Sequence, residues 1–128
     1  MRSFFSSRSR SFRNAFAGWW FVIRTQKNAW IHAVVGLAVI VLGIWLQLST
    51  VDWSIIILAI ALVWTAEFLN TALEAVVDLA SPQEHNLAKI GKDVGAAAVL
   101  IAAISSVLIG LLILGPPLWK RIQILITN

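Results

Sequence analysis

The stretch AEFLNTALEAVVDLA, from Ala66 to Ala80, places four polar side chains in a long apolar run. On a helix that turns about 100° per residue, the spacing of Glu67, Asn70, Glu74 and Asp78 returns them to one face. A carboxylate inside a bilayer costs at least about 2.5 kcal/mol, so each one needs a partner, water or a chemical role. We therefore expect the functional site along this face.

The composition around this stretch is that of a membrane protein. Of the 128 residues, 59% are hydrophobic and only 12% are charged, and the mean hydropathy is +0.85. These values exclude an ordinary soluble domain and favour a single membrane domain over residues 1–128. The chain has no cysteine, which excludes a disulfide framework and a thiolate metal site.

The apolar pattern predicts an all-α fold with a surface helix and three membrane spans. Residues 1–28 are expected to be cytoplasmic and interfacial, because apolar residues recur between Ser11 and Arg24 at the spacing of an amphipathic helix. An amphipathic helix that packs on the rest of the protein would have the same pattern. Transmembrane helices are expected over residues 31–48, 53–80 and 94–114, followed by an outer tail over residues 116–128.

The basic residues predict how the chain is oriented. Of the ten lysines and arginines, eight lie at the N-terminus or in the connection over residues 81–92, and none lies in the loop over residues 47–53. This distribution predicts a bacterial inner-membrane protein with its N-terminus inside and its C-terminus outside. So apolar a chain favours anionic lipid head groups over nucleic acid as the counter-charge, and we expect no nucleic-acid partner.

Small residues recur at four-residue steps along the third expected span. Such spacing lets membrane helices approach closely, although small residues are also simply tolerated in helices. The positions form two series, Gly91 and Gly95 and then Ala98, Ala102, Ser106 and Gly110.

The predicted orientation gives each polar residue a depth. Glu67 falls about two turns inside the cytoplasmic boundary, Glu74 at the boundary and Asp78 beyond it, level with Lys92 and Asp93. Such a gradient suits phosphoryl transfer from a water-soluble anionic substrate to a lipid hydroxyl, in which carboxylates bind Mg²⁺ and a buried one accepts a proton. A membrane proton or ion pathway also uses buried carboxylates, and a structural role in helix association is a third possibility.

The spacing ExxNxxxExxxD over residues 67–78, followed by KD at 92–93 and then GAAAVLI, resembles the prokaryotic diacylglycerol kinase family, which includes undecaprenol kinases. The resemblance extends from about Arg13 to Leu114. It implies a small homotrimer with a surface helix, three spans and active sites between neighbouring subunits. It also implies a lipid kinase that uses MgATP to phosphorylate diacylglycerol or undecaprenol.

The resemblance implies a role for each polar residue of the second span. Glu67 would be the general base toward the lipid hydroxyl, Asn70 would orient the site, and Glu74 would bind Mg²⁺. Lys92 would meet the ATP phosphates, and Asp93 would fix that lysine. The residues implied near the nucleotide are Asp78, Glu84 and His85.

Gln26 departs from the family pattern. The family usually has a second metal-binding glutamate eight residues after the glycine that is Gly18 here, and this chain has Gln26. A glutamine carbonyl can bind a hard cation but adds no charge, so Gln26 is a doubtful metal ligand. A catalytically weakened family member with a structural role is therefore an alternative. His32 stands where some members have an acid, and we interpret it as an interfacial residue.

Overall fold

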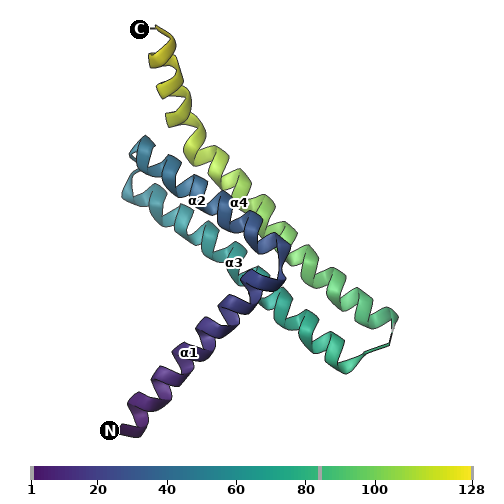
Figure 1. Cartoon of the computed structure of the whole chain (residues 1–128). Helices are drawn as coiled ribbons and strands as arrows, with labels where there is room; N and C mark the ends of the chain where they lie inside the picture. The colour runs from purple at the N-terminus through teal and green to yellow at the C-terminus, as the bar shows by residue number, and fades with distance from the viewer. Residues whose placement is uncertain (1, 84, 128) are drawn as a thin grey trace.

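The computed structural model describes residues 2–83 and 85–127, and over these residues it is entirely helical apart from short connections. Its helices are α1 (Arg2–Thr25), α2 (Lys27–Leu46), α3 (Thr50–Ala80) and α4 (Asn86–Thr127). The last three are each long and apolar enough to cross a membrane. The prediction of an all-α membrane protein with three spans is confirmed, and the two termini lie at opposite ends of the molecule (Figure 1).

A tight turn joins α2 to α3. Gln47 adopts the left-handed conformation (φ 56°, ψ 51°) that ends many helices. Ser49 then caps α3 by accepting a hydrogen bond from the backbone N–H of Asp52, whose carboxylate accepts one from the backbone N–H of Ser49. The polar QLSTVDW segment therefore contains the turn of a helical hairpin. The end of α2 and the start of α3, which meet at this turn, are both capped.

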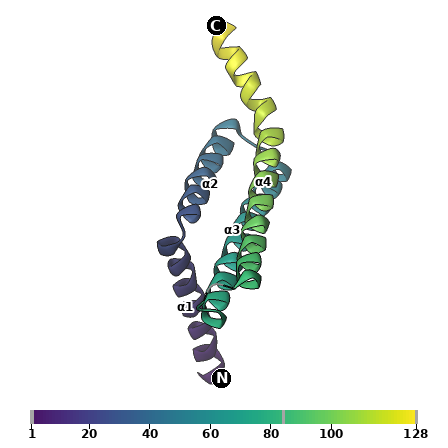
Figure 2. The same cartoon turned by 90° about the vertical axis from the view of Figure 1, so that its right-hand side faces the viewer.

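Helices α3 and α4 lie side by side in both views (Figures 1 and 2). Gly95 and Ala102 of α4 are buried, and the Ser106 hydroxyl donates a hydrogen bond of 3.1 Å to the backbone carbonyl of Ala59 on α3. Close approach is confirmed at Gly95, Ala102 and Ser106, whereas Ala98 is exposed. Gly110 differs, because a Cβ there would meet no atom within 4 Å.

The elbow between α1 and α2 packs against the middle of α3. Val22, Ile23 and Ala29 form a buried cluster, and Trp64 and Phe68 of α3 pack against it. The Trp64 and Phe68 ring centroids are 5.9 Å apart. This contact places the first turns of α2 beside the segment of α3 that contains Glu67.

The rest of α1 diverges from the bundle (Figure 1). Phe12, Phe16 and Trp20 are each more than half exposed, while Ile23 at the end of the same stripe is buried. The amphipathic pattern thus serves packing only at its C-terminal end. The expected place of the helix on the membrane surface stays a prediction.

Helix α4 is longer than the span predicted over residues 94–114. It begins at Asn86, so Lys92 and Asp93 lie about two turns into the helix, and it continues through Pro116 and Pro117. The helix changes direction near these prolines (Figures 1 and 2), as expected where two backbone N–H donors are missing. The expected stop at residues 115–117 is therefore a bend within one helix.

Candidate functional site

The polar residues of α3 form a column whose burial falls steadily toward the end of the helix. Glu67 is 1% exposed and Asn70 is 9% exposed, whereas Glu74 is half-buried and Asp78 is exposed. The order of burial is the one that the sequence predicts. A water-soluble group can therefore approach one end of the column, while the other end lies inside the protein.

Asn70 links the two halves of this column. Its Nδ2 donates a hydrogen bond of 3.0 Å to Oε1 of Glu74, while its buried Oδ1 has no hydrogen-bond partner. Gly95 of α4 faces this amide, and a Cβ at that position would overlap Oδ1 of Asn70. The glycine thus leaves the space that the amide occupies.

Glu67 lies against His32, a residue that the sequence pattern does not assign to the site. Its Oε2 is 3.8 Å from Nε2 of His32, the two side chains are 2% and 16% exposed, and neither atom has a hydrogen bond. Counted from Leu48 in the turn, His32 lies sixteen residues back and Glu67 nineteen residues forward. That near-equal count was the available signal, because antiparallel helices place such residues at similar levels.

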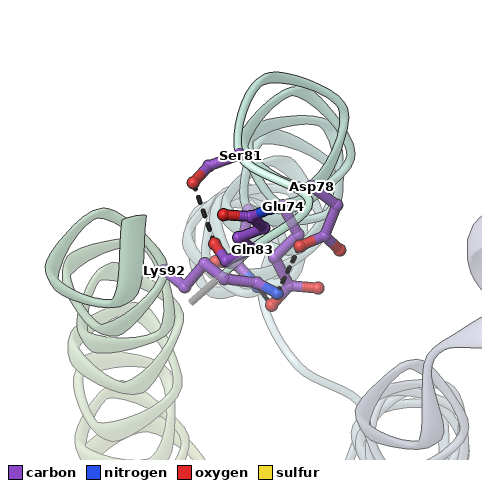
Figure 3. A network of polar contacts seen from close by, with 6 residues as sticks. Glu74, Asp78, Ser81, Gln83 and Lys92 are labelled. Carbon is purple, nitrogen blue, oxygen red and sulfur yellow. Dashed lines mark hydrogen bonds and ion pairs between the residues drawn. The ribbon is translucent and has the colours of Figure 1, made fainter. Parts of the chain in front are cut away.

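Lys92 reaches from α4 to the exposed end of the column. Its Nζ donates a hydrogen bond of 2.7 Å to Oδ1 of Asp78, as Figure 3 shows. The carboxylate of Glu74 also acts electrostatically on this ammonium. The acid that contacts Lys92 is thus Asp78, whereas Asp93, expected to fix the lysine, is an exposed neighbour.

A polar hollow of about 660 Å³ lies between the end of α3 and the start of α4. Its volume is within the range of small-molecule sites. Glu84 was also predicted to lie near the nucleotide, but it falls outside the described residues. The polar residues that line the hollow are Asp78, Ser81, Gln83, His85, Asn86, Lys89, Lys92 and Asp93. The structure therefore brings together four predicted site residues and adds Lys89, whose position in a loop-like sequence gave no signal.

A second hollow, of about 460 Å³, is an apolar groove between α2, α3 and α4. Its walls include Val39 of α2, Val63 of α3 and Leu114 of α4, and His32 and Trp64 also line it. The groove therefore runs within the apolar part of the three-helix arrangement and reaches the residue that contacts Glu67.

The donor set suits a magnesium ion shared with phosphates. Over the described residues, no three His, Cys, Asp or Glu side chains form a metal-binding group. Mg²⁺ commonly takes one or two carboxylates and substrate phosphates rather than a full protein cage, and Glu74 fits that arrangement. Gln26 is half-buried at the start of α2, and its side chain forms no cap hydrogen bond there.

Residues 13–114 match the family model described as prokaryotic diacylglycerol kinase. The chain belongs to the prokaryotic diacylglycerol kinase family. The undecaprenol kinase of Bacillus subtilis (strain 168) is 43% identical over 109 residues, which cover 85% of this chain and 89% of that protein. The diacylglycerol kinase of Synechocystis sp. is 48% identical over 109 residues, 84% of this chain and 62% of that protein.

A third relative, the diacylglycerol kinase of Escherichia coli (strain K12), is 37% identical over 89 residues, covering 64% of this chain and 73% of that protein. As a member of the prokaryotic diacylglycerol kinase family, the protein is a membrane lipid kinase that uses ATP. This function accounts for a column that joins a buried carboxylate to a polar hollow.

Proposed function

We propose that the protein transfers the γ-phosphate of ATP, with Mg²⁺, to the hydroxyl of diacylglycerol or undecaprenol at the inner face of the bacterial cytoplasmic membrane. The observation that supports this most directly is the continuous column on α3. It begins at buried Glu67, passes through the Asn70–Glu74 hydrogen bond and ends at the Asp78–Lys92 pair beside the polar hollow. One helix thus connects an apolar region for the lipid acceptor to a solvent-exposed region for the phosphates.

In this proposal the nucleotide occupies the polar hollow. Lys92 and Lys89 lie on its α4 wall and offset the phosphate charge, which grows in the transition state. Asp78 orients the Lys92 ammonium through their 2.7 Å hydrogen bond. His85 and Asp93 line the same hollow and contact the nucleotide, as does Glu84 by its place in the connection.

Glu74 would hold Mg²⁺ together with the phosphates, and Gln26 would be a weak second ligand. When bound, the ion neutralises charge on the β- and γ-phosphate oxygens. Asn70 binds Oε1 of Glu74, which restrains the carboxylate and leaves its second oxygen for the cation.

Glu67 accepts the proton of the lipid hydroxyl. The hydroxyl oxygen then forms a bond to the γ-phosphorus while the bond from that phosphorus to the β–γ bridging oxygen breaks and ADP leaves. The burial of Glu67 favours a lipid over water as the acceptor, which limits ATP hydrolysis.

The active unit in this proposal is a homotrimer whose sites form between subunits. Glu67 and Glu74 are seven residues apart, about 10 Å along α3, so one helix face cannot enclose both substrates. Large apolar side chains are exposed on all three candidate spans, and a neighbouring subunit would cover part of them. Native mass measurement of the protein extracted in lipid nanodiscs tests this, and a monomer would contradict it.

The N-terminus lies inside and the C-terminus outside in this proposal. Because the chain has no cysteine, single substitutions such as Asn14→Cys and Gln123→Cys report on each end. In intact cells, a membrane-impermeant maleimide should label only the variant at position 123. Labelling of position 14 alone would reverse the orientation.

The decisive experiment uses purified protein in mixed micelles with labelled ATP, given diacylglycerol and undecaprenol separately. Transfer to one lipid supports the proposal and identifies the acceptor. Transfer to neither, even at high Mg²⁺, would contradict it. The buried Glu67–His32 pair would also suit a proton pathway, so proton flux into liposomes without lipid phosphorylation would favour that alternative. If neither lipid phosphorylation nor proton flux is found, a structural role is favoured.

A further inference from the structure

We propose that His32 binds the hydroxyl of the lipid acceptor together with Glu67. This makes His32 a residue that positions the acceptor oxygen, rather than an interfacial residue at the start of a span. The inference rests on the lipid kinase reaction proposed above and adds to it the group that holds the hydroxyl.

The first support is the separation of two buried atoms. Nε2 of His32 and Oε2 of Glu67 are 3.8 Å apart, which is longer than the 2.7–3.2 Å typical of a direct hydrogen bond. Both atoms are buried and without a hydrogen bond. An oxygen placed about 2.8 Å from each atom would satisfy both, once a small side-chain movement opens the space that these two buried atoms now close.

The second support is the position of His32 between the column and the apolar groove. His32 lines one end of the groove, and its imidazole also contacts Glu67. The hydroxyl of Ser106, a second polar group on the groove, already donates to the backbone of Ala59. An alcohol with a long hydrocarbon chain in the groove would therefore find its polar partners at His32 and Glu67.

In this proposal His32 and Glu67 hold the lipid hydroxyl through one hydrogen-bond donor and one hydrogen-bond acceptor. Nε2–H of His32 donates to the hydroxyl oxygen, and the hydroxyl donates to Oε2 of Glu67. During transfer the proton moves to Glu67, the oxygen–phosphorus bond forms and the bond to ADP breaks. His32 neither gains nor loses a proton, so its effect is to fix the direction of the hydroxyl.

Kinetics of the full-length protein in mixed micelles test this role. His32→Leu should lower kcat and raise the KM for the lipid by about tenfold each, with the KM for MgATP within about twofold of the original protein. His32→Gln keeps an N–H donor and should retain at least about a third of kcat/KM. Ser54→Ala, an exposed change on α3 thirteen residues before Glu67, serves as control. Equal loss in the Gln and Leu variants, or a rise in the KM for MgATP, would overturn the inference.

A binding measurement without ATP keeps the inference separate from the reaction. Dioctanoylglycerol and farnesol are each compared with their methyl ethers, and the protein should prefer the alcohols by about fivefold, a preference that His32→Leu removes. If transfer occurs but His32→Leu changes neither readout, the inference fails and the kinase proposal stands. If no lipid is phosphorylated but the preference depends on His32, the kinase proposal fails and the hydroxyl site stands.

Discussion

The side chain of Asn70 connects the buried half of the site to the solvent-exposed half. Its Nδ2 donates a hydrogen bond of 3.0 Å to Oε1 of Glu74, while its Oδ1 faces Gly95 on the neighbouring helix. The amide is 9% exposed, so the packing of α3 on α4 controls its position. The helix pairing and the orientation of the proposed metal ligand are therefore connected through one side chain.

Removal of the proposed base should affect turnover more than nucleotide binding. We expect Glu67→Gln to lower kcat at least about 100-fold, because general base catalysis contributes about 10²–10⁴-fold. The KM for MgATP should stay within about twofold, since Glu67 lies about three helical turns from the polar hollow. Steady-state kinetics at saturating lipid measure both values, and an unchanged kcat would refute the assignment.

Glu74→Gln should instead weaken the use of MgATP. The amide keeps an oxygen for Asn70 but brings no charge to the cation, so we expect the half-saturating Mg²⁺ concentration to rise at least about tenfold. High Mg²⁺ should recover part of the lost rate. A Mg²⁺ titration at fixed ATP measures this, and a curve that overlays that of the original protein would show that another residue binds the metal.

Lys92→Met should raise the KM for MgATP about tenfold or more while leaving thermal stability nearly unchanged. The stability effect is small because both partners of the Lys92–Asp78 pair are exposed to solvent. Lys92→Arg is the matched control, because it keeps the charge at a similar reach. A large fall in the melting temperature of the Met variant would indicate a structural rather than a phosphate-binding role.

Gly95→Ala should destabilise the protein by about 1–3 kcal/mol, because the added methyl group overlaps Asn70 and must displace it or α4. Displacement of Asn70 should also lower kcat. Gly110→Ala is the control on the same helix, since no atom lies within 4 Å of its added Cβ. Thermal unfolding in detergent compares the two variants, and equal melting temperatures would show that α3 and α4 separate readily.

Gln26→Glu should lower the Mg²⁺ concentration needed for half-maximal activity, because it adds a carboxylate at the position that is doubtful as a ligand. The same Mg²⁺ titration measures this change. If the curve does not move, another acid, from this chain or from a neighbouring subunit, already binds the cation.

Much of the fold could be predicted because the signals are local. Apolar runs of span length predict α2, α3 and α4, and steps of three and four residues predict that the polar side chains of α3 share a face. The QLSTVDW segment contains the Ser49–Asp52 capping box, which has a recognisable spacing. Each of these features depends on residues within one continuous segment of the sequence.

The parts that could not be predicted depend on packing between distant segments. The choice of Asp78 over Asp93 as the partner of Lys92 follows from the way α4 lies on α3, and His32 meets Glu67 because the α1–α2 elbow docks on α3. The continuation of α4 through Pro116 also runs against local preference, since a transmembrane-type helix can bend at proline without ending.

Because α3 is one long uninterrupted helix, the turnover rate should depend on the thickness of the bilayer. The 31 residues of α3 span about 46 Å, whereas the hydrocarbon layer is about 30 Å thick. The polar column from Glu67 to Asp78 lies on this one helix. Hydrophobic mismatch is relieved by tilt or by local deformation of the lipid, and either one moves Glu67 and Asp78 together relative to the head groups. Turnover should therefore pass through a maximum as the acyl chains of the host membrane are lengthened, with no change in any protein contact.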